Sequence, residues 1–207
     1  MGATQPKQFL TLNGMPILMH TLKRLNAGLP NAEIVVALPE EHMDAWVALI
    51  DEHDFSVKHT CVKGGEQKFH SVKNALEKCS GELIMVHDGV RPFVSDTTLN
   101  AILEKAISAK AVVPVQTMTE SVRKGNMDSS ESVDRSAYFT VQTPQCFHAE
   151  ILHKAYNQEY NSLFTDDASV VEKLGEEVKL VEGNSENIKI TKPEDLKMAN
   201  YLLNQMD

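Results

Sequence analysis

A buried strand that runs into a charged loop is the strongest local signal in the chain, at Leu83-Ile84-Met85-Val86-His87-Asp88-Gly89-Val90-Arg91-Pro92. Its first four residues are all apolar, which is typical of a strand that is covered on both faces. Asp88 follows this strand directly, at the edge where open α/β sheets bind their ligands. A carboxylate there can hold Mg²⁺ between phosphates, and Arg91 can donate two hydrogen bonds to one phosphate. The alternative is an ordinary Asp-Gly turn followed by a surface arginine.

Apolar runs recur on both sides of this stretch, separated by segments with helical spacing. The predicted strands cover 34–38, 57–62, 83–86, 111–115, 178–181 and 188–190. The predicted helices between and after them begin near positions 16, 43, 68, 95, 149, 166 and 193. Strands that alternate with helices in this way are typical of an α/β fold with a mostly parallel sheet flanked by helices.

The alternation breaks between 116 and 145. Two extended pieces, 121–124 and 138–141, are separated there by polar residues and a glycine, which predicts a projecting β-hairpin arm. The alternative is a disordered loop. A short arm buries little of itself, so we expect it to lie on a second subunit and to lend it side chains. Arg135 is then a candidate phosphate clamp, and its alternative is a solvated arginine.

Composition limits the partners and the compartment. The 207 residues fit one domain, and a formal net charge of −9 argues against nucleic acid or an anionic membrane as a partner. No stretch reaches the roughly 20 apolar residues of a membrane span. Cys61, Cys79 and Cys146 lack metal-site spacing and fit free thiols in a reducing compartment. We therefore expect a cytoplasmic protein that meets any phosphate ligand with a local cluster of bases.

Two motifs in the first half of the chain could face a ligand. Lys7 can neutralise charge that grows on a phosphoryl group, although a surface lysine is the simpler interpretation. Gly64-Gly65 precedes a predicted helix that carries Ser71, and this arrangement can bring backbone donors and a hydroxyl to a ligand. The alternative is a plain turn from strand to helix.

Two more motifs lie in the second half. Thr165-Asp166-Asp167 suits a helix cap. Lys189 interrupts an apolar run, where it faces either the solvent or the ligand crevice at the end of the predicted strand. The histidines show no metal-ligand spacing, and we interpret His87 as local support for Asp88 rather than as a catalytic base.

Taken in order, these motifs resemble the 2-C-methyl-D-erythritol 4-phosphate cytidylyltransferase family, enzymes of the non-mevalonate isoprenoid pathway. The resemblance covers nearly the whole chain, through segments 6–10, 64–72, 87–92, 133–135, 143–145, 165–169 and 182–191. It implies a Rossmann-like nucleotidyltransferase domain over 1–207 and a homodimer joined through the arm at 116–145. It also implies Mg²⁺-dependent attack of a sugar-alcohol phosphate on the α-phosphorus of CTP, with pyrophosphate leaving.

The resemblance also implies roles for single residues. Lys7 and Lys189 stabilise the charge on the α-phosphate, while Asp88 and Arg91 hold the nucleotide and the acceptor, with Asp88 as the metal ligand. The cytidine is faced by Gly64, Gly65 and Ser71. The phosphate and hydroxyls of the acceptor are bound by Thr143, Thr165 and Arg135, the last from the partner chain.

Two features depart from the family pattern. Lys68 stands where the family usually carries an arginine, so the bidentate fork is lost. The family also opens with a strand and a glycine-rich A-A-G-x-G-x-R-M-G loop, of which Met1-Gly2 match only the last two letters. We therefore expect the natural chain to begin upstream of Met1. Two other functions stay open: a ribitol-5-phosphate cytidylyltransferase, and a non-catalytic nucleotide-binding homologue.

Overall fold

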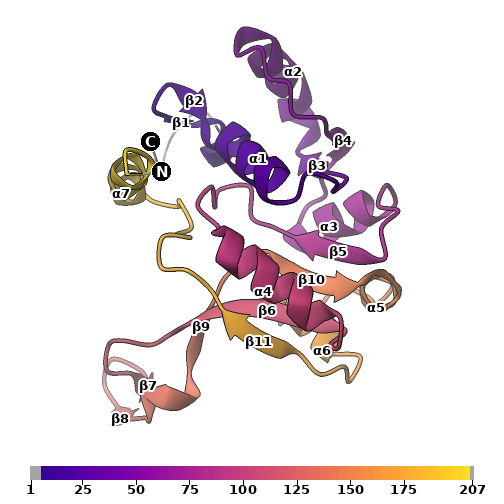
Figure 1. Cartoon of the computed structure of the whole chain (residues 1–207). Helices are drawn as coiled ribbons and strands as arrows, with labels where there is room; N and C mark the ends of the chain where they lie inside the picture. Colours follow the sequence, from indigo (N-terminus) through magenta and orange to yellow (C-terminus); the bar gives the residue numbers. More distant parts are fainter. Residues whose placement is uncertain (1–5, 206–207) are drawn as a thin grey trace.

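A mixed five-stranded sheet forms the centre of the computed structural model, which describes residues 6–205 (Figure 1). Its path runs β11-β6-β10-β5, and β9 also pairs with β6. These strands are β5 (Leu83–Val86), β6 (Ala111–Thr117), β9 (Phe139–Val141), β10 (Gln145–His148) and β11 (Lys179–Glu182). The predicted α/β class is confirmed. The sheet is mixed because β10, which the sequence did not predict, lies antiparallel between β5 and β6, and because β9 is also antiparallel to β6.

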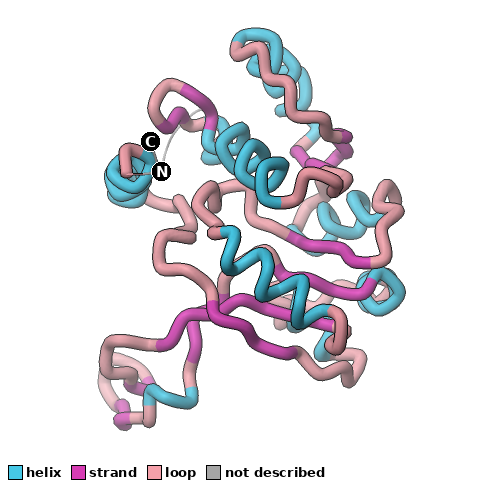
Figure 2. The backbone as a smooth tube through the Cα atoms, in the orientation of Figure 1, coloured by secondary structure: helices cyan, strands magenta, loops and turns pink. Residues whose placement is uncertain are grey.

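Alternation along the strands divides the core into two layers. Val112 and Cys146 face a cluster formed with α4 (Asp96–Ala106), whereas Val113 and Phe147 face the larger cluster on the other side. That larger cluster is built with α3 (Lys68–Leu76), α5 (Ala149–Tyr156) and α6 (Asp167–Glu172). Helices therefore cover both faces of the sheet, and Figure 2 shows α4 crossing it on one side.

Residues between 9 and 61 contribute a separate apolar cluster that includes the buried Trp46. Here β3 (Val35–Leu38) and β4 (Thr60–Lys63) form a separate parallel pair. The 3₁₀ turn Lys7–Phe9 brings Phe9 against Trp46, with ring centroids 5.7 Å apart. The remaining elements are β1 (Thr11–Leu12), β2 (Met15–Pro16), α1 (Ile17–Gly28), the 3₁₀ turn Glu40–His42 and α2 (Met43–Glu52). Met1-Gly2, which we compared with the glycine-rich loop, lie outside the described residues.

A hairpin does project from the sheet; its first strand overlaps the predicted piece 121–124, but its second strand was not predicted. It pairs β7 (Arg123–Gly125) with β8 (Ser130–Ser132). The turn is tight because the Asn126 side chain accepts hydrogen bonds from two backbone N–H groups and Gly125 has φ +140°. The other predicted piece, 138–141, returns instead to the main sheet as β9. Between them lies the 3₁₀ turn Arg135–Ala137.

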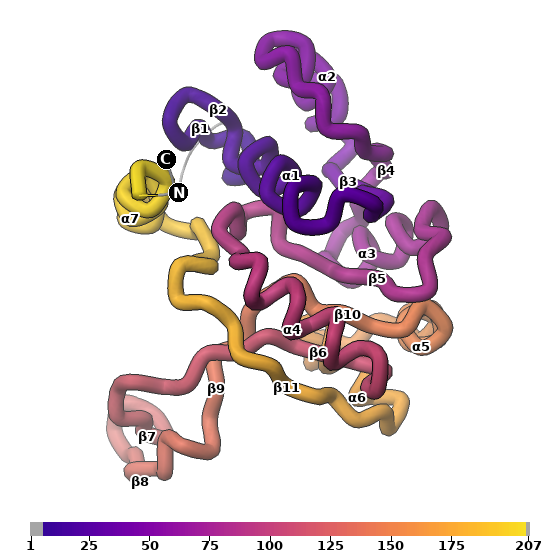
Figure 3. The backbone as a smooth tube through the Cα atoms, in the orientation of Figure 1, coloured from indigo at the N-terminus to yellow at the C-terminus, as the bar shows by residue number. Residues whose placement is uncertain are grey.

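The predicted strand at 188–190 is absent from the described residues. Its amides find separate partners instead of a ladder: the N–H of Ile188 donates to Glu186 O, and that of Ile190 donates to Val90 O. The segment leads into α7 (Pro193–Leu203), where the Asp195 side chain accepts hydrogen bonds from the backbone N–H groups of Thr191 and Lys192 just before the helix. Figure 3 follows this segment past the loop after β5. None of the helices within 6–205 is long and apolar enough to cross a membrane.

Candidate active site

Three basic side chains converge on the carboxylate of Asp88, which is 11% exposed at the end of β5. Its Oδ2 lies 3.1 Å from Arg91 Nε and 3.1 Å from Lys189 Nζ. Its Oδ1 lies 3.8 Å from Lys68 Nζ, at the start of α3. The sequence placed Asp88, Arg91 and Lys189 as candidates, and the structure brings these three together.

The charge state of Asp88 follows from this arrangement. Burial raises the pKa of its carboxyl, but Lys68, Lys189 and Arg91 outweigh burial and hold the pKa below its usual value. The group is therefore ionised at neutral pH. Three cations face the carboxylate of Asp88, and Lys68 also pairs with Asp167. The side chains of Lys68 and Lys189 are both partly exposed, so their positive charge is accessible to a polyanionic ligand.

Thr143 joins the cluster from the segment between β9 and β10. Its Oγ accepts a hydrogen bond from the Asp88 amide at 3.0 Å and lies 3.0 Å from His87 Nδ1. The other ring nitrogen, His87 Nε2, lies 3.0 Å from the Arg91 carbonyl oxygen. Since a carbonyl only accepts, Nε2 carries the proton, and the Thr143 hydroxyl donates to Nδ1. The chain of bonds fixes the loop 87–91 and confirms a supporting place for His87.

His87 should stay neutral well below the usual range of histidine. Burial lowers its pKa to about 4, from an ordinary 6.5. Between these two pKa values the unfolded state binds a proton that the folded state does not bind. The free energy of unfolding should therefore fall as pH drops from 6.5 towards 4. The shift corresponds to about 3 kcal/mol of unfolding free energy.

Urea unfolding of the native chain and of His87→Gln at pH 7 and pH 4 checks this expectation. The native chain should lose about 3 kcal/mol more than the variant, which lacks the titrating ring. Parallel losses in both proteins, or an NMR titration of His87 centred near its ordinary pKa, would contradict it.

A second network ties Arg91 to the segment before α7. Arg91 Nη1 donates to the backbone oxygen of Asn187 at 2.7 Å. The buried amide of Asn187 in turn donates through Nδ2 to the Thr143 carbonyl at 2.8 Å. This network fixes the backbone two residues before Lys189. The sequence analysis quoted Asn187 only as part of a motif, since an asparagine carries no distinct signal for such a place.

Lys68 makes a closer ion pair on its other side. Its Nζ lies 2.6 Å from Asp167 Oδ2, and Asp167 Oδ1 accepts from the Tyr156 hydroxyl at 2.6 Å. The helix cap expected of Thr165-Asp166-Asp167 comes from Asp166, whose Oδ1 accepts from the Ser169 amide. The sequence analysis missed the roles of Asp167 and Tyr156, because their partners are distant in the chain.

The Gly64-Gly65 motif and Ser71 do come together. The amide of Gly65 donates to Ser71 Oγ at 3.0 Å, which closes the turn between β4 and α3. A Cβ on Gly65 would lie 2.3 Å from His70 Cβ, so this position excludes a side chain. The turn leads directly into Lys68, so it lies beside the cluster around Asp88.

Three candidates lie outside the Asp88 cluster. Lys7 is exposed on its 3₁₀ turn and forms no ion pair with the described residues. Arg135 lies on the exposed arm and donates from Nη1 to the Thr119 carbonyl. Thr165 is exposed immediately before the Asp166 cap.

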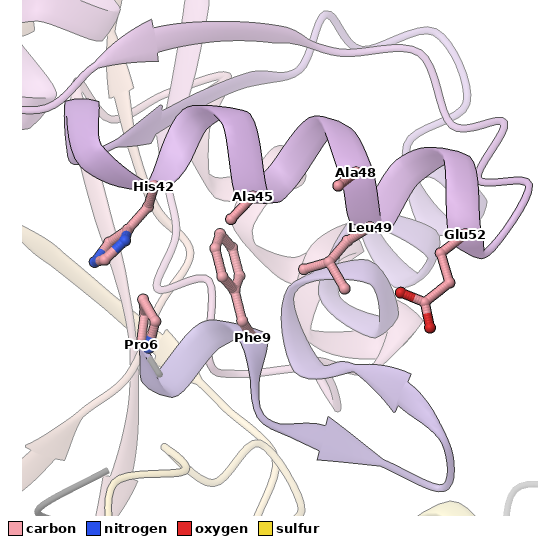
Figure 4. Close-up of a pocket in the computed structure, with 7 residues that line it drawn as sticks. All are labelled: Pro6, Phe9, His42, Ala45, Ala48, Leu49 and Glu52. Atoms are coloured by element: carbon pink, nitrogen blue, oxygen red, sulfur yellow. The ribbon is translucent and has the colours of Figure 1, made fainter. Parts of the chain in front are cut away.

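A shallow hollow elsewhere in the molecule does not coincide with this cluster. It lies between the 3₁₀ turn at Phe9 and one side of α2, with mostly apolar walls and with His42 and Glu52 at its rim (Figure 4). It shares no residue with the surroundings of Asp88. The hollow also lacks converging positive charge, so the Asp88 cluster remains the candidate active site.

The donor set at Asp88 fits a metal that the substrate helps to hold. Within 6–205, no group of three or more His, Cys, Asp or Glu side chains could bind a metal ion by itself. Mg²⁺ commonly takes only one or two carboxylates, with phosphates and water completing its shell. Asp88 supplies one ionised carboxylate, and it would hold such a metal once the substrate phosphates draw away the basic side chains that now face its oxygens.

Comparison with known proteins gives one consistent family. Residues 1–205 match the model of the 2-C-methyl-D-erythritol 4-phosphate cytidylyltransferase family. Curated members from Bacteroides fragilis and Bacteroides thetaiotaomicron are 49% and 50% identical, each over 98% of this chain and 93% of the relative. The crystal structure of the Thermus thermophilus member superposes with a TM-score of 0.82 at 33% identity, over 96% of this chain and 94% of that one.

Proposed function

Since the chain belongs to the 2-C-methyl-D-erythritol 4-phosphate cytidylyltransferase family, we propose that it transfers CMP from CTP to 2-C-methyl-D-erythritol 4-phosphate. A phosphate oxygen of the acceptor attacks the α-phosphorus of CTP. The bond from that phosphorus to the oxygen bridging to the β-phosphate breaks, and pyrophosphate leaves with the electron pair. The product serves non-mevalonate isoprenoid biosynthesis.

The convergence of Lys68, Arg91 and Lys189 on Asp88 carries this proposal. Phosphoryl transfer requires mainly positioning and neutralisation of charge on the phosphate oxygens. Lys189, with its side chain 47% exposed, can leave Asp88 for a phosphate without being pulled from a closed core. Together with Lys7, it stabilises the charge on the α-phosphate, while Arg91 and Asp88 hold the nucleotide and acceptor.

The remaining roles are part of the same proposal. The cytidine is faced by Gly64, Gly65 and Ser71, and the acceptor by Thr143, Thr165 and Arg135. When bound, Mg²⁺ at Asp88 supplies positive charge to the phosphates. Removing divalent cations with EDTA should therefore abolish turnover, and added Mg²⁺ should restore it.

We further propose a homodimer built from one domain per chain, 1–207, with 116–145 as the dimerisation arm. Tyr138, Phe139 and Val141 are each more than 40% exposed on this arm in the single chain. A second subunit would cover these side chains and place Arg135 at its partner's acceptor site. Three free cysteines fit the reducing cytoplasm as the compartment.

The test is pyrophosphate release by the chain with CTP and Mg²⁺, with each acceptor offered separately. We expect release with 2-C-methyl-D-erythritol 4-phosphate and none with ribitol 5-phosphate. Release with ribitol 5-phosphate alone would overturn the assignment in favour of the related enzyme. CTP binding without release in either mixture would instead support the non-catalytic homologue.

A further inference from the structure

The carboxylate of Asp167 occupies an unusual position for a group at a helix start. It is 1% exposed, yet the cap of α6 is already supplied by Asp166. Its two oxygens take one hydrogen bond each, from the Tyr156 hydroxyl and from the Lys68 ammonium, both at 2.6 Å. A buried carboxylate with two such donors is well satisfied and has little freedom to move.

Lys68 lies between this buried carboxylate and the active-site cluster. Its Nζ is 2.6 Å from Asp167 Oδ2 and 3.8 Å from Asp88 Oδ1. Burial lowers the pKa of Lys68, but Asp167 and Asp88 outweigh it and hold the pKa above its ordinary value. The side chain is therefore a fixed cation at neutral pH, with 44% of its surface still open to a ligand.

Tyr156 also contacts the start of α3, the helix that begins with Lys68. Its buried ring stacks on Phe69, the neighbour of Lys68, with centroids 4.7 Å apart and planes 26° from parallel. The ring holds the beginning of α3, while the hydroxyl orients Asp167. Both contacts restrict where the Lys68 ammonium can lie.

We propose that Tyr156 and Asp167 are positioning residues that hold the Lys68 ammonium beside Asp88, ready for the phosphates of the nucleotide. A free lysine side chain loses roughly 2 kcal/mol of rotamer entropy when a ligand fixes it. Here the buried carboxylate has fixed it before the ligand arrives, so binding avoids most of that loss. The inference rests on the proposed function and adds two residues that never touch the substrate.

A double-mutant cycle on the full-length chain tests the inference. Tyr156→Phe keeps the ring and removes only the hydroxyl that orients Asp167. We expect it to raise both KM and the calorimetric Kd for CTP roughly tenfold, the size of a hydrogen bond to a charged group, with kcat within about twofold. In a Lys68→Met background, Tyr156→Phe should raise KM and Kd for CTP by less than about twofold, because the cation that Tyr156 helps to position is gone.

Tyr160→Phe is the matched control. Tyr160 belongs to the same aromatic group, with its ring 5.7 Å from that of Phe69, but its side chain is half-exposed. This variant should leave KM, Kd and the melting temperature unchanged. If Tyr156→Phe folds poorly, Asp167→Asn replaces it in the cycle, since it keeps the shape and removes the charge.

Two results would overturn the inference. One is an unchanged CTP affinity in Tyr156→Phe. The other is an equal increase in Kd for CTP from Tyr156→Phe in the native and the Lys68→Met backgrounds, which would make the role of the hydroxyl merely structural. Both are distinguishable from failure of the proposed function, in which the unmodified chain releases no pyrophosphate with either acceptor.

Discussion

Replacing Lys189 by methionine is expected to lower kcat for CMP transfer roughly 10²- to 10³-fold, the cost of removing one group that stabilises transition-state charge. Methionine keeps much of the length of the side chain and removes its charge. Lys189 Nζ lies 3.1 Å from Asp88 Oδ2, so its ammonium already faces the centre of the cluster. The measurement is steady-state pyrophosphate release at saturating CTP and acceptor.

Lys197→Met is the control for this change. Lys197 is exposed on α7, the helix that follows the Lys189 segment, and lies outside the cluster around Asp88. Its replacement should leave kcat within about twofold. A Lys189→Met enzyme with native kcat and a raised KM would show that Lys189 binds the ground state and the transition state equally, instead of stabilising the transition state selectively.

Replacing Asp88 by asparagine is expected to lower kcat/KM roughly 10²- to 10³-fold and also to destabilise the fold. The amide keeps the shape but leaves Arg91 and Lys189 without their carboxylate partner, while Lys68 loses only the more distant of its two carboxylates. Loss of a fully buried ion pair costs about 3–5 kcal/mol. We expect roughly 2 kcal/mol here, because both lysines are half-exposed and screened by solvent.

The acid dependence of stability gives an independent readout for Asp88. Since its folded pKa lies below the usual carboxyl value, its contribution to stability is complete above that value and is lost as pH falls through the folded pKa. Asp88→Asn should lack this loss in urea unfolding measured between pH 5 and pH 2. Equal acid profiles in the two proteins, with native turnover in the variant, would remove Asp88 from the proposed site.

Local pattern was enough to predict much of the fold. The strand Leu83–Val86 is confirmed with its predicted boundaries, and the helices Lys68–Leu76 and Ala149–Tyr156 begin where they were predicted to begin. The strand is a continuous apolar run, and in the two helices apolar side chains recur at the helical period. The strand Gln145–His148 was missed because its first residue fell within the predicted arm at 116–145 and its last residue directly precedes the predicted helix at 149.

The candidate site also has residues that the sequence could predict and residues that it could not. Asp88 and Arg91 could be predicted because a buried strand ends just before them, and Lys189 because a charge interrupts an apolar run. Tyr156 reads from the sequence as an ordinary core residue of a helix. Its hydrogen bond to Asp167 depends on how α5 and α6 pack, and no local pattern encodes that. The catalytic and binding roles of all the candidate residues stay predictions, including those of Lys7, Arg135 and Thr165.

The reversed direction of β10 has a consequence for the order in which the chain can fold during synthesis. Its start lies opposite the end of β5, so Thr143 reaches Asp88 only after the arm has been made. The partners Lys68 and Asp167 are 99 positions apart, and Arg91 and Asn187 are 96 apart. Closing such long loops is slow, so the nascent chain should form its helices well before it gains affinity for nucleotide.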